Sequence, residues 1–229
     1  MLKYSKIVQT DKYKRFRENI HNKIEEGKNQ MNKKGITILM LMSSLTVMVG
    51  TAITPAAAEL GRVYNLGNYA SWLITTPALG VVASTVLFGR LIDKKGPYWL
   101  AFAGLFCYGL FGIAGAFMPN VVTLLADRFL LGAATAAVMN ASVSFISTYF
   151  HGERQLKILA MQSMSMELGG VVYLSVSGML ADMSWRSPFF IYGLGFLSFL
   201  GLVFFIPRTQ AAPVHTDSGQ ETPSEIQRG

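Results

Sequence analysis

The sequence predicts an all-α membrane protein, folded as a bundle of six transmembrane helices. Of its 229 residues, 51% are hydrophobic and only 14% are charged. A bilayer core of ~30 Å requires ~20 helical residues, and each of six apolar stretches reaches that length. Irregular backbone facing lipid would leave amides and carbonyls unpaired, which favours helices. The predicted spans lie near residues 36–58, 69–88, 98–118, 122–148, 158–181 and 188–206.

Basic residues lie in alternate connections between these spans, and this pattern predicts the orientation of the chain. Ten Lys or Arg residues lie in 1–35, three in 89–97, two in 149–157 and two in 207–229. The connections on the other side hold only Arg62 and Arg186. This asymmetry of seventeen to two predicts that both termini are cytoplasmic.

The segments outside the predicted bundle are polar. We expect 1–35 to be a basic cytoplasmic arm, of which 1–30 is dispensable because Met31 is a natural start just before the first span. The arm has no signal-peptide pattern, and its charge could also hold it on anionic membrane lipid. The tail 207–229 is rich in Pro, Ser, Thr and Gln and is predicted to be disordered.

The composition gives no support to an enzyme, a metal centre or a nucleic-acid-binding protein. His21, His151 and His215 are predicted to lie in the arm, a connection and the tail, so they form no metal-ligand cluster. Cys107 is the only cysteine, and no phosphate-binding loop or nucleophile elbow is present. The net charge of +7 follows from topology and requires no nucleic-acid partner. We therefore expect no cofactor, no metal and no enzymatic activity.

The connection between the second and third spans carries the most specific motif. It reads Gly89-Arg90-Leu91-Ile92-Asp93-Lys94-Lys95-Gly96. It resembles the signature loop of the major facilitator superfamily, whose pattern is Gly-x-Leu-x-Asp-Arg/Lys-x-Gly. Pro97 and Tyr98 depart from the basic residues that usually follow. The alternative is an ordinary tight basic turn, since Gly and Lys are common in such turns.

The resemblance implies a fold and a mechanism. It implies the N-terminal half of a transporter, made of two inverted three-helix repeats, in which two halves rock around a site near the midplane of the membrane. It also implies that Asp93 engages the second half and acts as a conformational latch. We expect a second six-helix half as partner, supplied by a homodimer, a separate chain or a missing C-terminal part.

The fourth predicted span carries Asp127 and Arg128, followed by Gly132, similar to a second motif of the family. Arg128 lies roughly 10 Å deep, where a charge costs ~2.5 kcal/mol or more, so it should face the bundle and find a partner. Asp127 lies about 100° around the helix, so the two side chains meet through their length or point at different neighbours. The residues are candidates for proton coupling. Alternatively, Arg128 is an anchor that hydrogen-bonds backbone carbonyls.

Glu167 is the deepest acidic residue, roughly 13 Å into the fifth predicted span. Such a carboxylate is a candidate proton carrier or ligand for a cationic substrate. The alternative is a neutral Glu that is hydrogen-bonded to Ser163, Ser165 or a neighbouring helix.

Glycines and prolines in the spans predict close packing and bending. Gly169, Gly170 and Gly178 follow Glu167 where antiporters of the family carry a glycine-rich motif, although this copy of the motif is degraded. Small residues allow close helix approach, which we also expect at Gly132. Pro55 and Pro77 each remove a backbone hydrogen bond and permit bends in the first two spans.

These observations predict a secondary active transporter half, with proton-coupled efflux of a small organic molecule by alternating access. We expect it in the bacterial inner or plasma membrane as a multi-pass protein. The alternative is a truncated or degenerate membrane protein that transports nothing.

Overall fold

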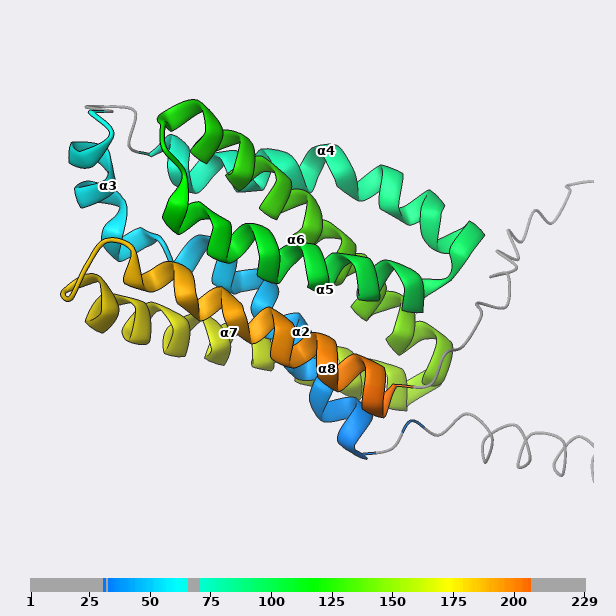
Figure 1. Cartoon of the computed structure of the whole chain (residues 1–229). Coiled ribbons are helices and arrows are strands. Elements are labelled where there is room, and N and C mark those ends of the chain that lie inside the picture. The colour runs from blue at the N-terminus through cyan, green and yellow to red at the C-terminus, as the bar shows by residue number, and fades with distance from the viewer. Residues whose placement is uncertain (1–30, 32, 66–70, 207–229) are drawn as a thin grey trace, which may run out of the picture.

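The computed structural model describes residues 31, 33–65 and 71–206. In this part of the chain all regular structure is helical (Figure 1). The helices are α2 (Lys33–Thr51), the 3₁₀ turn η1 (Thr54–Ala56), α3 (Ala57–Val63), α4 (Trp72–Lys95), α5 (Pro97–Ala114), η3 (Gly115–Phe117), α6 (Val121–Tyr149), α7 (Gly152–Ala181), η4 (Ser187–Gly193) and α8 (Leu194–Phe205). The expectations for the arm 1–30 and the tail 207–229 lie outside the described residues.

Six helical segments are long and apolar enough to cross a membrane. The first combines α2, η1 and α3, and the sixth combines η4 and α8, while α4, α5, α6 and α7 each form one span. The predicted fold class, an all-α bundle of six spans, is confirmed.

The two ends of the described chain lie at the same end of the bundle, together with the α4–α5 and α6–α7 connections (Figure 1). We call this the Gly96 end and the opposite end, where α3 and η3 lie, the Phe117 end. Seven basic residues of the described chain lie at or near the Gly96 end: Lys33, Lys34, Arg90, Lys94, Lys95, Arg154 and Lys157. Only Arg62 and Arg186 lie at the Phe117 end. The charge asymmetry of the sequence is therefore also an asymmetry of the folded bundle.

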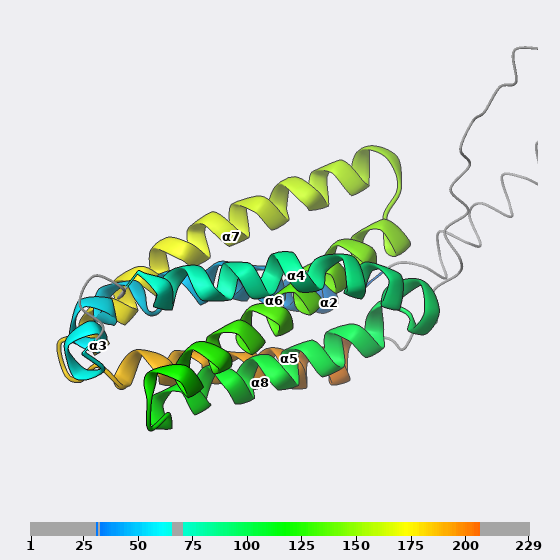
Figure 2. The same ribbon diagram turned by 90° about the horizontal axis from the view of Figure 1, so that it is seen from above.

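The most buried span is α6, and α2 contacts it together with α7 and α8. α6 packs against α4 and α5, and α5 packs against α8. α7 lies at one edge, with α2 as its main neighbour (Figure 2). In one apolar 18-residue stretch of each span, only 17% of the residues are buried in α4 and in α7, against 61% in α6. The two helices α4 and α7 therefore leave most of their surface available.

The crossing of α4 and α6 brings two backbones into contact. A Cβ added at Gly132 would overlap the carbonyl oxygen of Pro77, and one added at Gly80 would overlap the carbonyl oxygen of Phe129. Pro77 lies inside α4, where it has no amide hydrogen to donate. This is the close helix approach that small residues permit in membrane proteins.

The first span is interrupted at Pro55, which lies in the 3₁₀ turn η1. Because proline has no N–H, the α-helical ladder cannot continue here, and the amide of Ala56 donates to the carbonyl of Ile53 at 3.0 Å. The carbonyl of Ala52 instead accepts a hydrogen bond from Ser177 Oγ of α7. The carbonyl left unpaired by the break is thus hydrogen-bonded by a side chain of another helix, because an unpaired carbonyl is costly inside a membrane.

Candidate functional site

The charged side chains that are buried inside the bundle, among the described residues, lie on α6. This helix begins at Val121, where Asn120 caps it by accepting a hydrogen bond from the Thr123 amide at 3.0 Å. About two turns later the side chains of Asp127 and Arg128 are buried, with 2% and 0% exposure. Arg128 Nε and Nη2 donate to Asp127 Oδ2 at 3.1 and 2.7 Å. The arginine side chain is long enough to bridge the ~100° between neighbouring helix positions.

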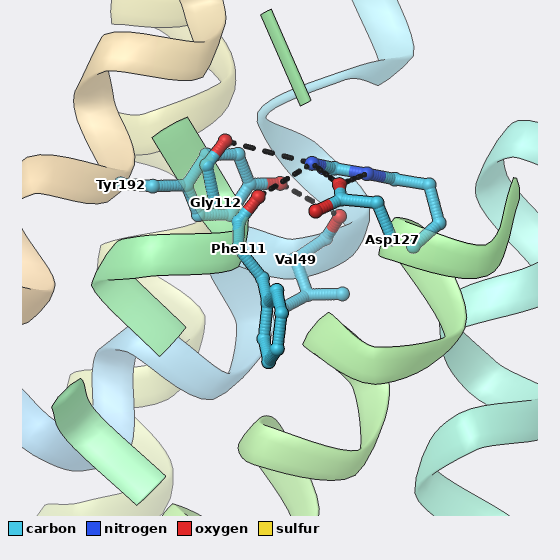
Figure 3. A network of polar contacts seen from close by, with 6 residues as sticks. Val49, Phe111, Gly112, Asp127 and Tyr192 are labelled. Carbon is cyan, nitrogen blue, oxygen red and sulfur yellow. Dashed lines mark hydrogen bonds and ion pairs between the residues drawn. The ribbon is translucent and has the colours of Figure 1, made fainter. Parts of the chain in front are cut away.

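Arg128 also binds the backbone of α5. Its Nη2 donates to the carbonyl of Phe111 at 3.2 Å and, more weakly, to that of Gly112 at 3.5 Å (Figure 3). The anchoring contacts to backbone carbonyls that the sequence suggested are therefore present. The side chain is fully buried within the bundle.

Two glycines allow close packing around this arginine, and two aromatic rings contact it. A Cβ at Gly115 would overlap Arg128 Nη2, and a Cβ at Gly112 would overlap the side chain of Tyr192. The guanidinium lies over the rings of Phe189 and Tyr192, 4.9 and 5.5 Å from their centroids. Both rings belong to η4, and their contacts with the guanidinium are cation–π interactions. Sequence reasoning missed both rings, although the glycine spacing in α5 was a signal for close packing.

Two tyrosines connect this cluster to α2. The Tyr192 hydroxyl donates to the carbonyl of Val49 at 3.2 Å (Figure 3), and the Tyr108 hydroxyl donates to the carbonyl of Leu45 at 2.6 Å. The two tyrosine rings lie 5.6 Å apart. Arg128 is therefore the centre of a network that joins α2, α5, α6 and η4.

Two polar atoms of the ion pair have no partner among the described residues. They are Asp127 Oδ1 and Arg128 Nη1, both of which are buried. A buried polar atom without a hydrogen bond costs ~1–3 kcal/mol, so this pair is incompletely stabilised. The arrangement is neutral as a pair and retains capacity for one more acceptor and one more donor.

Glu167 lies elsewhere, on an exposed part of α7. Ser163 Oγ donates to the carbonyl of Leu159 at 3.2 Å, and Ser165 Oγ donates to the carbonyl of Met40 at 3.1 Å. Both serines named as alternative partners of Glu167 therefore donate to backbone carbonyls. Within the described chain Glu167 has neither a hydrogen bond nor an ion pair, and no contact joins it to Asp127 or Arg128.

The glycines of α7 differ in their surroundings. A Cβ at Gly169 would lie 2.8 Å from Ser44 Cβ, and one at Gly170 would lie 3.1 Å from Val47 Cγ1. Both positions face α2 at close range. Gly178 differs from the expectation of close packing, because no atom of the described chain lies within 4 Å of the place of its Cβ.

The octapeptide Gly89–Gly96 forms the end of α4 rather than a loop. α4 continues to Lys95 and α5 begins at Pro97, so Gly96 alone connects them. Gly96 has φ 81° and ψ 162°, a conformation available essentially only to glycine, and its amide donates to the carbonyl of Ile92 at 2.8 Å. Arg90, Asp93 and Lys94 are exposed, and Leu91 is half-buried. Among the described residues Asp93 forms no ion pair.

Comparison with known proteins decides the family. Residues 39–228 match the sequence profile of the Major Facilitator Superfamily. The chain belongs to the major facilitator superfamily. It is therefore a protein of a transporter family, not an enzyme, and its six spans fit the N-terminal half of a family transporter.

Three superfamily relatives are named for resistance or transport. The chain is 28% identical over 156 residues to the puromycin resistance protein of Streptomyces alboniger, covering 66% of this chain and 31% of that protein. It is 25% identical over 167 residues to multidrug resistance protein 1 of Bacillus subtilis, covering 70% and 42%. It is 29% identical over 171 residues to the 4-hydroxybenzoate transporter of Pseudomonas aeruginosa, covering 68% and 37%. The chain thus spans well under half the length of these superfamily relatives.

Proposed function

We propose that this chain is the N-terminal half of a proton-coupled transporter that exports a small organic molecule by alternating access. The observation that carries the proposal is Glu167, a carboxylate in the middle of a span without a partner in the described chain. A charged group at that depth is costly, which favours a functional role over a structural one. Membership of the superfamily supports transport as the general activity.

The two acidic sites have different roles in this proposal. Asp127 is the counter-ion of the buried guanidinium of Arg128, and loss of its charge would leave that guanidinium unpaired. Asp127 and Arg128 therefore act as a structural anchor. Glu167 has no cation beside it and takes up and releases the proton as access alternates.

A second six-helix half completes the transporter in this proposal. Alternating access requires two halves that rock around a site between them. α4 and α7 are the least buried spans, and they expose large apolar side chains such as Val82, Val86, Leu168 and Val171. Asp93 is exposed at the Gly96 end, where it is free to contact a second half and act as a latch. The second half is a C-terminal part, a separate chain or a parallel second copy.

The proposal also specifies the orientation of the protein in the membrane and the direction of transport. The basic Gly96 end faces the cytoplasm, as the positive-inside rule predicts, and the protein lies in a bacterial plasma membrane. Export is favoured by two of the three relatives, which are named for drug resistance. The third relative is named for transport of an aromatic acid, and a small organic substrate is common to all three.

The test uses the chain together with its second half in inverted membrane vesicles, with puromycin and 4-hydroxybenzoate as probes. We expect probe uptake into the vesicles that collapses when the pH gradient is removed. Glu167→Gln should abolish the dependence on the gradient, whereas Asp93→Asn should reduce transport without removing that dependence. Absence of uptake for a broad panel of organic probes would favour the competing reading of a degenerate, non-transporting protein.

A further inference from the structure

α7 is attached to α2 by a row of polar side chains. Gln162 Nε2 donates to Ser43 Oγ at 3.0 Å, and the hydroxyls of Tyr173 and Ser44 share a hydrogen bond of 2.8 Å. Further contacts run from Ser165 Oγ to the carbonyl of Met40 at 3.1 Å and from Ser177 Oγ to the carbonyl of Ala52. We call these four contacts the α2–α7 ladder.

The ladder occupies one face of α7. Gln162, Ser165, Gly169, Tyr173 and Ser177 follow one another at intervals of three or four residues, which places them along one side of a helix. Gly169 lies in the middle, where a Cβ would come within 2.8 Å of Ser44 Cβ. This face therefore approaches α2 closely.

Apolar packing cannot choose this rotation by itself. Met164, Leu168 and Val171 are 63%, 65% and 66% exposed, so they are not packed inside the bundle. Lipid tails are as apolar as leucine, so there is little gain in turning these side chains into the bundle. The rotation of α7 about its axis must therefore be set by its hydrogen bonds and by the close contact at Gly169.

The ladder also determines where Glu167 points. Glu167 follows Gln162 by five residues and so lies ~140° around the helix from it, away from α2. Ser163 and Met164 lie one turn earlier on the same face, and Val171 lies one turn later. Met164 and Val171 are exposed, so this face of α7 does not pack against the bundle. A carboxylate on this face is unsuited to lipid.

We propose that Gln162 and Tyr173 are positioning residues, which hold α7 at the rotation that directs Glu167 away from α2. The relevance of this inference to transport rests on the proposed function, in which Glu167 carries the proton. The rotation itself is a property of the helix pair and can be measured without a substrate.

Disulfide cross-linking in native membranes measures the rotation. The background is the full chain with Cys107→Ala, which removes its only cysteine. Val47→Cys is combined either with Gly170→Cys, whose Cβ would lie 3.1 Å from Val47 Cγ1, or with Val171→Cys, which is exposed. The first pair should cross-link strongly and the second weakly. Replacing Gln162→Leu and Tyr173→Phe together should lower the ratio of the two yields about tenfold, because two interhelical hydrogen bonds are lost.

A control and a rescue make the result specific. Ser175→Ala removes a hydroxyl that binds only the carbonyl of Val171 in its own helix, at 2.9 Å, and should leave the ratio unchanged. Exchanging the partners, Ser43→Gln with Gln162→Ser, should keep the parent ratio because the hydrogen bond can form in reverse. An unchanged ratio in Gln162→Leu/Tyr173→Phe, or a loss of cross-linking in the exchanged chain as well, would overturn the inference.

The result of the cross-linking test does not depend on whether Glu167 couples transport to protons. Failure of the cross-linking test would remove the positioning role and leave Glu167 as the proton carrier. Unaltered coupling in Glu167→Gln would instead remove the proposed function and leave the ladder intact.

Discussion

The guanidinium of Arg128 and the carboxylate of Asp127, neighbours in sequence on α6, form a buried ion pair with an Nη2–Oδ2 distance of 2.7 Å. Consecutive helix residues do not normally face each other. They meet here because Arg128 also donates to the carbonyl of Phe111 and lies against the ring of Phe189, which draw its side chain across the bundle. The pair therefore holds α5, α6 and η4 together at one depth.

Asp127→Asn should destabilise the protein by ~3–5 kcal/mol, because the substitution leaves the buried guanidinium of Arg128 without its counter-ion. Unfolding of the purified protein in detergent, followed by circular dichroism, measures the effect. Glu167→Gln is the matched control, since Glu167 has no partner in the described chain, and it should change stability little. Equal losses in the two variants would contradict the anchoring role of the pair.

Gly115→Ala should cost ~1–3 kcal/mol, because the new methyl group would overlap Arg128 Nη2 and the Phe189 ring in a packed interior. Gly178→Ala is the comparison. That position has open space around it and lies within α7, so alanine should be neutral or stabilising by ~0.5–1 kcal/mol. Thermal unfolding of both variants shows whether each substitution lowers or raises the stability of the protein. A neutral Gly115→Ala would show that the arginine can move aside at no cost.

Gly96→Ala should cost ~1–3 kcal/mol, because φ 81° and ψ 162° are strongly disfavoured for a residue with a Cβ. Gly89→Ala, seven residues earlier in α4, provides the control, since no atom lies within 4 Å of the place of its Cβ. Protease sensitivity of the α4–α5 connection in membranes reports the local loss. The prediction fails when the two alanine variants are equally resistant.

Ser177→Ala should loosen the break in the first span, because the Ala52 carbonyl loses the hydroxyl that it binds. One interhelical hydrogen bond in a membrane is worth ~0.6 kcal/mol, which corresponds to about threefold faster hydrogen exchange around η1. Ser175→Ala, whose hydroxyl binds its own helix, should leave exchange at η1 unaltered. Mass spectrometry of peptides covering Thr54–Ala56 distinguishes the two outcomes.

Several features of the site could be read from residues alone because each depends on local chemistry. Arg128 had to face the bundle, since a charge at its depth is too costly in lipid. The residue types and spacing of the octapeptide Gly89–Gly96 indicated the family. In the structure the octapeptide forms the last two turns of α4, which Gly96 closes. Residues alone left open whether Asp127 and Arg128 meet or point at different neighbours. The structure shows that they meet and that Arg128 also binds a carbonyl of α5.

The amino-acid sequence by itself determined the six spans, the segregation of basic residues to one end and the family, because hydropathy and charge act on each segment separately. Only the tertiary structure showed that Tyr192 and Phe189 enclose Arg128, that Ser177 completes the broken helix at Ala52, and that Glu167 stands apart from Asp127. The reason is that these relationships depend on the rotation of each helix about its axis. In a membrane, burial of apolar residues contributes little to that rotation, which depends on close packing at small residues and on polar contacts between segments far apart in the sequence.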